Sequence, residues 1–292
     1  MKFHLFAAAA ALALGAAGAA NAAPEVEIKH AVARVVVIPE AGRTEVKVEI
    51  IPGTAELPRL DVRTTGSGKV IIDGGLDRKI RGCNQSGIVL GNEVNPVNPP
   101  DNLRVRIKGQ DDVRMKDAPL VTIRTPMSVK VGAGGAVYGS VGRSENLSLG
   151  SSGCGDWTVG NVSGRMDLAI AGSGDMRTGT AGDTEISISG SGDVDTGAVR
   201  QLEVNISGSG DVTVAQSTGP VDVSIAGSGD VKVKGGRISK TAVSIAGSGD
   251  VNVDADVADL NVNIMGGGDV RVRSAQNVSK HIMGGGSVVV GN

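Results

Sequence analysis

Aromatic residues are almost missing from this chain of 292 residues, which contains one Trp, one Tyr and two Phe. Phe3 and Phe6 lie at the N-terminus, so Tyr138 and Trp157 are the only aromatic residues in the rest of the chain. Binding sites that stack nucleic-acid bases or sugar rings rely on aromatic side chains. The composition therefore argues against such stacking sites.

An excess of basic charge is also missing, because 29 Lys and Arg residues face 31 Asp and Glu residues, for a net charge of −2. Nucleic-acid-binding proteins carry a basic surface, so no nucleic-acid partner is expected. Beyond the N-terminus no apolar run is long enough for a transmembrane segment.

The N-terminus has the features of a signal peptide, predicted to span residues 1–22. Lys2 precedes an apolar run from Leu5 to Gly18, and Ala20-Asn21-Ala22 matches the small-residue pattern of a cleavage site. The mature protein is therefore expected in the periplasm, in the medium or at the cell surface. The only two cysteines, Cys83 and Cys154, are expected to pair in such an oxidising compartment, although free thiols are the alternative.

A repeated motif dominates the second half of the chain, Ile-Ala/Ser-Gly-Ser-Gly-Asp-Val. Its second glycine recurs with spacings of 18, 18, 19, 20, 19 and 18 residues at Gly174, Gly192, Gly210, Gly229, Gly249, Gly268 and Gly286. Counting back by 19 and then 20 residues reaches Gly155 and Gly135, which extends the repeat to nine turns. A constant period near 20 residues is typical of a solenoid, whose turns bury their inner faces against one another.

Within one repeat, apolar residues and glycines share one phase of a period of two. This phase contains Leu202, Val204, Ile206, Gly208, Gly210, Val212 and Val214, and polar residues occupy the other. Such alternation places Val and Ile inside and polar side chains outside. Glycines between the two apolar runs predict a corner without room for a Cβ atom and tolerant of positive φ. These glycines are the predicted structural corners.

The predicted fold class is all-β, a single-stranded parallel β-helix with coils of 18 to 20 residues and a right-handed turn. An antiparallel sandwich would not require the same motif at every turn. We assign the regular solenoid to residues 126–292. Residues 23–125 have an irregular β pattern, which predicts early coils plus an excursion around Gly74–Ala118 that carries Cys83. A separate small β domain is the alternative.

These residues resemble a known family. The repeated motif, together with Gly153–Trp157 and Pro126–Gly142, is similar to the GIN domain, the head domain of auto-transporter adhesins. The resemblance covers most of the predicted mature chain and is strongest from Gly135 onward. It implies a parallel β-helix and a role at the cell envelope or surface.

One aspartate follows each corner, and stacking would align these residues in a column: Asp156, Asp175, Asp193, Asp211, Asp230, Asp250 and Asp269. Carboxylates about 4.8 Å apart are candidate Ca²⁺ ligands, because Ca²⁺ takes several oxygen ligands. The favoured alternative is that each carboxylate accepts backbone N–H groups at its own corner, as in an Asx-turn.

No catalytic set stands out. The motif serines would need a nearby base to act as nucleophiles, and His30 and His281 are the only histidines after the predicted signal peptide; the serines are Ser173, Ser191, Ser209, Ser228 and Ser248. Outward cations near Asp230 and Asp269 leave a carbohydrate-active enzyme as an alternative; they are Lys232, Lys234, Arg271 and Arg273.

The sequence thus favours an exported, non-enzymatic protein without a cofactor. Its polar outer faces are expected to bind a protein or polysaccharide at the envelope or surface. A Ca²⁺-stabilised module and a carbohydrate-active enzyme are the alternatives. A flat face or an uncapped coil end would permit a homo-oligomer.

Overall fold

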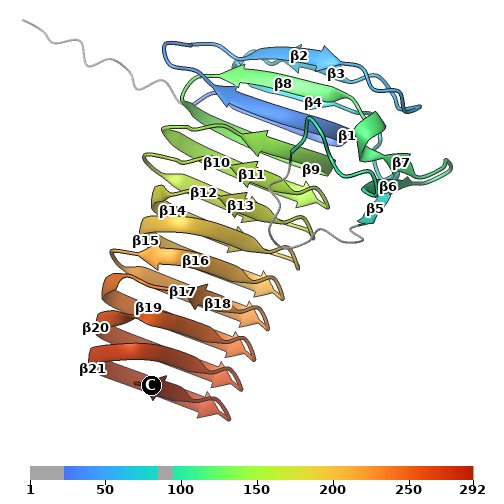
Figure 1. Ribbon diagram of the computed structural model, residues 1–292. Coiled ribbons are helices and arrows are strands. Elements are labelled where there is room, and N and C mark those ends of the chain that lie inside the picture. The colour runs from blue at the N-terminus through green and yellow to red at the C-terminus, as the bar shows by residue number, and fades with distance from the viewer. Residues whose placement is uncertain (1–22, 85–94, 292) are drawn as a thin grey trace, which may run out of the picture.

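The structure is a computed structural model that describes residues 23–84 and 95–291. These residues form a stack of β-coils with β2 and β3 at one end and the C-terminal strands at the other (Figure 1). The predicted signal peptide, residues 1–22, lies outside the described residues, as does part of the predicted excursion, residues 85–94.

From residue 128 onward each coil combines strands on two sides of the stack, joined through the glycine corner. The strands are β9 (Ser128–Val141), β10 (Asn146–Gly153), β11 (Trp157–Val159), β12 (Met166–Ile170), β13 (Met176–Thr178), β14 (Ala181–Ile188), β15 (Val194–Gly208), β16 (Val212–Ser217), β17 (Val221–Gly227), β18 (Val231–Val233), β19 (Arg237–Gly247), β20 (Val251–Gly266), β21 (Val270–Gly284) and β22 (Val288–Val290).

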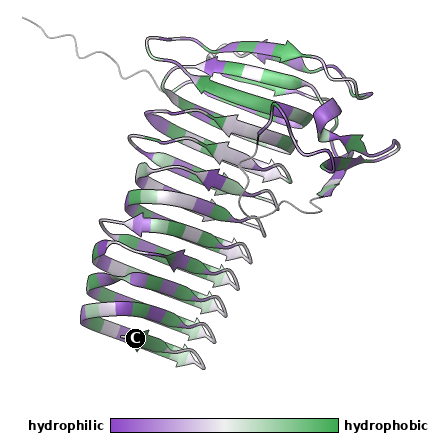
Figure 2. Cartoon of the chain, viewed as in Figure 1, coloured by the Kyte–Doolittle hydropathy of each residue, from purple (hydrophilic) through white to green (hydrophobic). Residues whose placement is uncertain are grey.

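Equivalent positions of successive coils pair in parallel, which confirms the predicted solenoid. Val223 of β17 lies beside Val204 of β15 on one side and Val243 of β19 on the other. All three valines are buried, and the polar residues between them face outward, so hydropathy alternates along the ribbon (Figure 2). Each fully buried Val or Ile contributes roughly 1.5–3 kcal/mol relative to exposure. Several such columns run side by side through the stack and form one hydrophobic core, which stabilises it.

The first coils are not stacked in chain order. β1 (Glu25–Pro39) lies between β9 on one side and β4 (Val70–Asp73) and β8 (Leu120–Thr125) on the other, and all these pairs are parallel. β2 (Lys47–Ile51) pairs antiparallel with β8, and β3 (Asp61–Thr64) pairs antiparallel with β4. These two strands cover the edge of the first coil, which would otherwise offer unpaired backbone groups.

The excursion folds into a small antiparallel sheet of its own. Its elements are β5 (Ile80–Asn84), β6 (Arg104–Ile107), β7 (Val113–Arg114) and the short 3-10 helix η1 (Met115–Asp117). Val105 and Met115 pack in one hydrophobic cluster with Val32 and Tyr138 of the solenoid. The excursion therefore shares a core with the stack and lies beside its first coils (Figure 1).

The structure buries Trp157 completely. Its ring lies over Gly139 of the preceding coil, where an added Cβ atom would be 2.4 Å from the ring. Tyr138 is also fully buried. No aromatic side chain is therefore exposed among the described residues.

Candidate functional site

Two columns of glycines form the corner of each coil. The first column, which passes through Gly208 and Gly227, carries positive φ values such as +155° and +151°. The second column is the one predicted from the motif, and its restriction is steric. A Cβ atom added at Gly229 would lie 2.2 Å from the carbonyl oxygen of Gly210 in the preceding coil. The same distance of 2.2 Å to the preceding coil recurs at Gly174, Gly192, Gly210, Gly249, Gly268 and Gly286.

The predicted stacking of Gly135 under Gly155 is wrong by two residues. Gly153 pairs with Gly135, and a Cβ atom on Gly155 would meet the backbone of Val137. Gly135 thus belongs to the first glycine column, and Val137 occupies the second at that level. Since the spacing of the repeat itself varies by two residues, counting glycines could not distinguish the two registers.

The motif aspartates form a continuous hydrogen-bonded column, which we call the Asp ladder. Oδ1 of each aspartate from Asp156 to Asp250 accepts the backbone N–H of the next aspartate at 2.8–2.9 Å. Oδ1 of Asp269 accepts the N–H and the hydroxyl of Ser287, each at 2.8 Å. The donors belong to the next coil, so the Asx-turn expected at each corner is wrong. The reason is stacking, which brings the neighbouring N–H within reach.

The backbone closes a second bond at the same place. The N–H of Val212 donates to the carbonyl oxygen of Asp230 at 2.8 Å, while the N–H of Asp230 donates to the carboxylate of Asp211. Neighbouring coils are thus linked at the Asp ladder by two hydrogen bonds, one donated from each coil. This structural role explains why an aspartate recurs at the corner.

Burial raises the pKa of two ladder carboxyls, Asp175 and Asp193. The N–H bond from the next coil lowers each pKa in part, and the carboxylates of Asp175 and Asp211 raise that of Asp193 further. Ionisation of Asp175 and Asp193 is therefore less favourable in the native state than in the unfolded state, which lowers the free energy of unfolding.

Replacing Asp211 with alanine is expected to lower the free energy of unfolding by about 1 kcal/mol, because the N–H of Asp230 loses its acceptor. Asp211→Asn is the matched control, since its side-chain oxygen can still accept that bond, and its effect should stay within about 0.5 kcal/mol. Urea unfolding measures both variants. Equal stability of the two variants would contradict a stabilising Asp ladder.

Asp193→Asn is expected to gain stability relative to the wild type as the pH rises from about 3 to 7. A raised pKa means that the native carboxyl binds its proton more tightly than the unfolded one. Its contribution to stability is present at low pH and is lost as the pH rises from the unfolded pKa, about 3.9, through the native one. Asparagine does not ionise, so the Asp193→Asn variant does not lose this stability. Urea unfolding of both proteins from about pH 3 to 7 measures the difference between their free energies of unfolding. A difference that does not change with pH would refute the prediction.

EDTA is expected to leave the melting temperature unchanged. Oδ1 of each ladder carboxylate is already bonded to a backbone N–H, and no three His, Cys, Asp or Glu side chains within residues 23–84 and 95–291 are grouped so that they could hold a metal ion. Thermal melts with EDTA and with added Ca²⁺ test this. A melting temperature that falls in EDTA and recovers with Ca²⁺ would instead support the calcium hypothesis.

The predicted disulfide between Cys83 and Cys154 is confirmed, with a Cα–Cα distance of 5.7 Å. Cys154 takes the place of the motif serine, so its side chain leaves the corner where β5 passes. Ile80 of β5 lies directly over Gly135, where an added Cβ atom would be 2.9 Å from its Cδ1. The disulfide and this contact hold the excursion against the corner column.

A cleft of about 800 Å³ lies between the excursion and the corners of the adjoining coils. The excursion contributes Arg78, Ile80 and Arg81, and the irregular bend within β1 contributes Lys29 and His30. The corners of the adjoining coils line its other side, including the exposed hydroxyls of Ser152 and Ser173 and the disulfide residue Cys154. Here a non-repetitive segment meets the repetitive surface.

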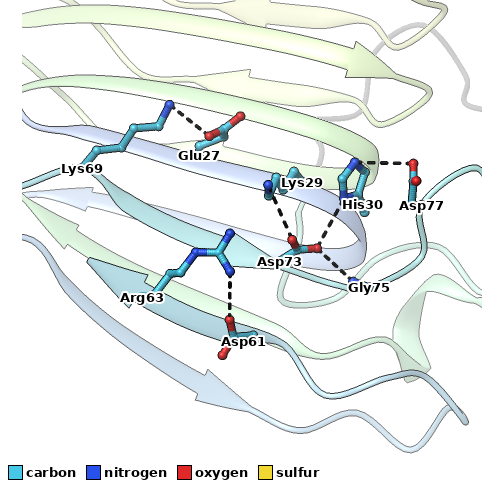
Figure 3. A network of polar contacts seen from close by, with 9 residues as sticks. All are labelled: Glu27, Lys29, His30, Asp61, Arg63, Lys69, Asp73, Gly75 and Asp77. Carbon is cyan, nitrogen blue, oxygen red and sulfur yellow. Dashed lines mark hydrogen bonds and ion pairs between the residues drawn. The ribbon is translucent and has the colours of Figure 1, made fainter. Parts of the chain in front are cut away.

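Ion pairs join β1 to the start of the excursion beside the cleft (Figure 3). Nδ1 of His30 lies 3.4 Å from Asp73, and Nε2 lies 3.7 Å from Asp77. Lys29 also pairs with Asp73, at 3.6 Å. The N–H of Gly75 above all, with His30 and Lys29, holds the pKa of Asp73 below its usual range. This network orients Lys29 and His30, two of the β1 residues that line the cleft.

A family model described as "Putative auto-transporter adhesin, head GIN domain" matches residues 92–237 and again residues 197–292. The matches overlap, as expected where successive coils are alike, and together they cover more than half of the chain. The chain belongs to the GIN-domain family. Residues 23–91, which supply β1 and part of the excursion, lie outside the matched ranges of the GIN domain.

The GIN-domain fold is also found in a solved structure of a "putative adhesin from Parabacteroides distasonis ATCC 8503". The two chains share 14% identity with a TM-score of 0.53, and the similarity covers 92% of each chain. At this identity the likeness shows the fold alone. No curated protein matches the chain.

The motif serines of this GIN domain are exposed on the corner surface. His30 is engaged by Asp73 and Asp77, and His281 is exposed on β21. Of the outward cations, Arg273 pairs with Asp254 and Asp256. No helix in the described part of the chain is long and apolar enough to cross a membrane.

Sequence reasoning identified the glycine columns, the Asp ladder and the disulfide of this GIN domain but missed the cleft. Arg78 and Arg81 belong to no repeat, and nothing in the sequence shows which coils they face. The signal that could have indicated them is the position of Cys83, two residues after Arg81, because a disulfide to the corner at Cys154 must bring this segment onto the column.

Proposed function

We propose that this GIN-domain chain is an exported, non-enzymatic binding module of the adhesin type that holds its partner in the cleft. The observation that carries the proposal is the excursion, which a disulfide and a shared hydrophobic cluster lock onto an otherwise uniform solenoid. A rigid wall reduces the ordering that binding would otherwise require. Because the other corners are nearly identical in sequence, the cleft is the surface most able to distinguish one partner from another.

The polar residues of the corner support binding over catalysis. Oδ1 of each ladder carboxylate is bonded to the next coil, and His30, beside the cleft, is paired with two aspartates. A nucleophilic serine needs a free base within hydrogen-bond reach, and the motif serines have no histidine partner among the described residues.

Export is supported by the signal-like N-terminus and by the disulfide, which is typical of an oxidising compartment. The family name likewise favours a location at the envelope or surface. Protease treatment of intact cells, compared with lysed cells, distinguishes a surface location from a periplasmic one.

The test of function is a binding panel. The protein without residues 1–22, with its disulfide intact, is immobilised and exposed to polysaccharides and cell-envelope proteins. Saturable and reversible binding of at least one of them is expected, without release of products. The Cys83→Ser/Cys154→Ser variant, which frees the excursion, should bind more weakly. New reducing ends or unsaturated sugars from any polysaccharide would show an enzyme, and absence of binding across the panel would refute the proposal.

A further inference from the structure

The cleft carries positive charge that no other described residue neutralises. Lys29 is paired with Asp73, and Glu27, the one acidic residue in the lining, is paired with Lys69 at 2.9 Å. Arg78 and Arg81 are exposed and have no ion pair with any residue in the described ranges. The cleft thus presents two arginines whose charge is available to a ligand.

Two residues that line the cleft have an unusual backbone conformation. Arg78 and His30 are the two non-glycine residues with positive φ among the described residues, at +51° and +50°, and both line this cleft. Such conformations are strained and persist where surrounding contacts impose them. Here the N–H of Leu76 donates to the carbonyl oxygen of His30 at 2.9 Å. Strained residues cluster at functional sites, and two of them line this cleft.

The remaining polar groups of the cleft include hydroxyls. The backbone N–H groups of Cys154 and Ser173 are used between coils, donating to Gly135 and Gly153 at 3.2 and 2.9 Å. Ser152 and Ser173 are exposed beside them; the Ser152 hydroxyl donates to the carbonyl oxygen of Ala133 at 3.4 Å and can still accept a hydrogen bond. The cleft can therefore offer two guanidinium groups and hydroxyl hydrogen bonds to one ligand.

The missing aromatic residues narrow the choice of ligand. Tyr138 and Trp157 are both fully buried, so within the described residues no ring is available to stack on a neutral sugar, the usual basis of aromatic binding platforms. Guanidinium groups instead bind carboxylate and sulfate oxygens through paired hydrogen bonds. The exposed carboxylates of the Asp ladder begin at Asp193, one coil beyond Ser173, and they repel a polyanion laid along the stack. Binding is thereby restricted to the cleft.

We propose that the cleft binds an acidic group of a polysaccharide, a uronic acid carboxylate or a sugar sulfate, through Arg78 and Arg81, with Ser152 and Ser173 bonding to neighbouring hydroxyls. This rests on the proposed function and names its ligand class. A polysaccharide is favoured over an acidic peptide because the corner side of the cleft offers glycines and hydroxyls rather than apolar pockets for peptide side chains.

The test titrates the mature, disulfide-bonded protein by calorimetry with oligogalacturonate, sulfated dextran, neutral dextran and polyglutamate. Binding is expected for oligogalacturonate, for sulfated dextran or for both, to weaken with added salt, and to be absent for the other two probes. Arg81→Ala and Arg78→Asn should each reduce affinity at least about tenfold. Asparagine is chosen because it tolerates positive φ. Arg104→Ala is the control, an exposed arginine on β6 outside the cleft lining, and should bind like the wild type.

The proposal is overturned if no acidic polysaccharide binds, if both cleft variants bind like the wild type, or if Arg104→Ala weakens binding equally, which would indicate general surface charge. Binding of polyglutamate with the same dependence on Arg81 would point to an acidic protein partner instead. Circular dichroism and intact disulfide in each variant exclude misfolding. If acidic polysaccharides fail while the wider panel still shows binding that depends on the disulfide, the binding function stands and this ligand assignment falls.

Discussion

Replacing Gly229 with alanine is expected to lower the free energy of unfolding by about 3 kcal/mol. The added Cβ atom would lie 2.2 Å from the carbonyl oxygen of Gly210 and 3.0 Å from Cγ2 of Ile206. The nearest obstacle is backbone, which cannot rotate away as a side chain could. Relief would require two coils to separate, which weakens their hydrogen bonds and exposes core residues. Urea unfolding gives the measurement.

Gly267→Ser is the matched control for this substitution. Gly267 stands between two corner glycines, in the position that serine occupies in other coils, and a Cβ atom there meets nothing within 4 Å. Its effect should stay within about 0.5 kcal/mol. If Gly229→Ala were as mild as this control, the close approach of successive corners would not be what stabilises the stack.

Replacing Cys83 and Cys154 together with serine is expected to lower the free energy of unfolding by about 4 kcal/mol, according to the loop-entropy model. The disulfide joins residues 71 positions apart, and it restricts the unfolded chain over a loop that includes β6, β8 and β9. Denaturant unfolding of the variant measures the loss, and the reduced wild type should match it.

Dithiothreitol provides the control, because it should destabilise the wild type and leave the serine variant unchanged. An unfolding midpoint in the oxidised wild type equal to that of the variant would contradict the prediction. The two experiments also separate two parts of the molecule. The glycine substitution acts on the repetitive stack, whereas the cysteine substitution acts on the excursion and its cleft.

The two kinds of surface suggest a division of roles. The solenoid repeats one corner, and its polar atoms largely satisfy one another, as at Asp211 and Asp230. The excursion interrupts that repetition and places Arg78 and Arg81 beside the corner without ion-pair partners among the described residues. In the proposed function, the stack is a rigid support and the irregular segment selects the partner.

The sequence alone determined the repetitive part of this protein. The alternation of apolar and polar residues around Val204 and Val223 predicted which side chains face the core. The second glycine of the motif predicted a corner that has no room for a side chain. Both features depend on residues a few positions apart or on the same position in successive coils. They can therefore be recognised from a sequence that repeats every 18 to 20 residues. The corner position of Cys154 likewise followed from the motif.

Only the tertiary structure decided which distant segments meet. It placed β1 between β9 and the pair β4 and β8, stacked Gly135 on Gly153, and gave each ladder carboxylate a donor in the next coil. It also brought Arg81 to the corner beside Ser152 and Ser173. The repeat predicts only contacts between equivalent positions of successive coils. The contacts of β1 and of the excursion join segments outside the repeat, and the pairing of Gly135 differs by two residues from the one that the glycine spacing predicts. They follow from how the whole chain returns and packs, which local patterns do not encode.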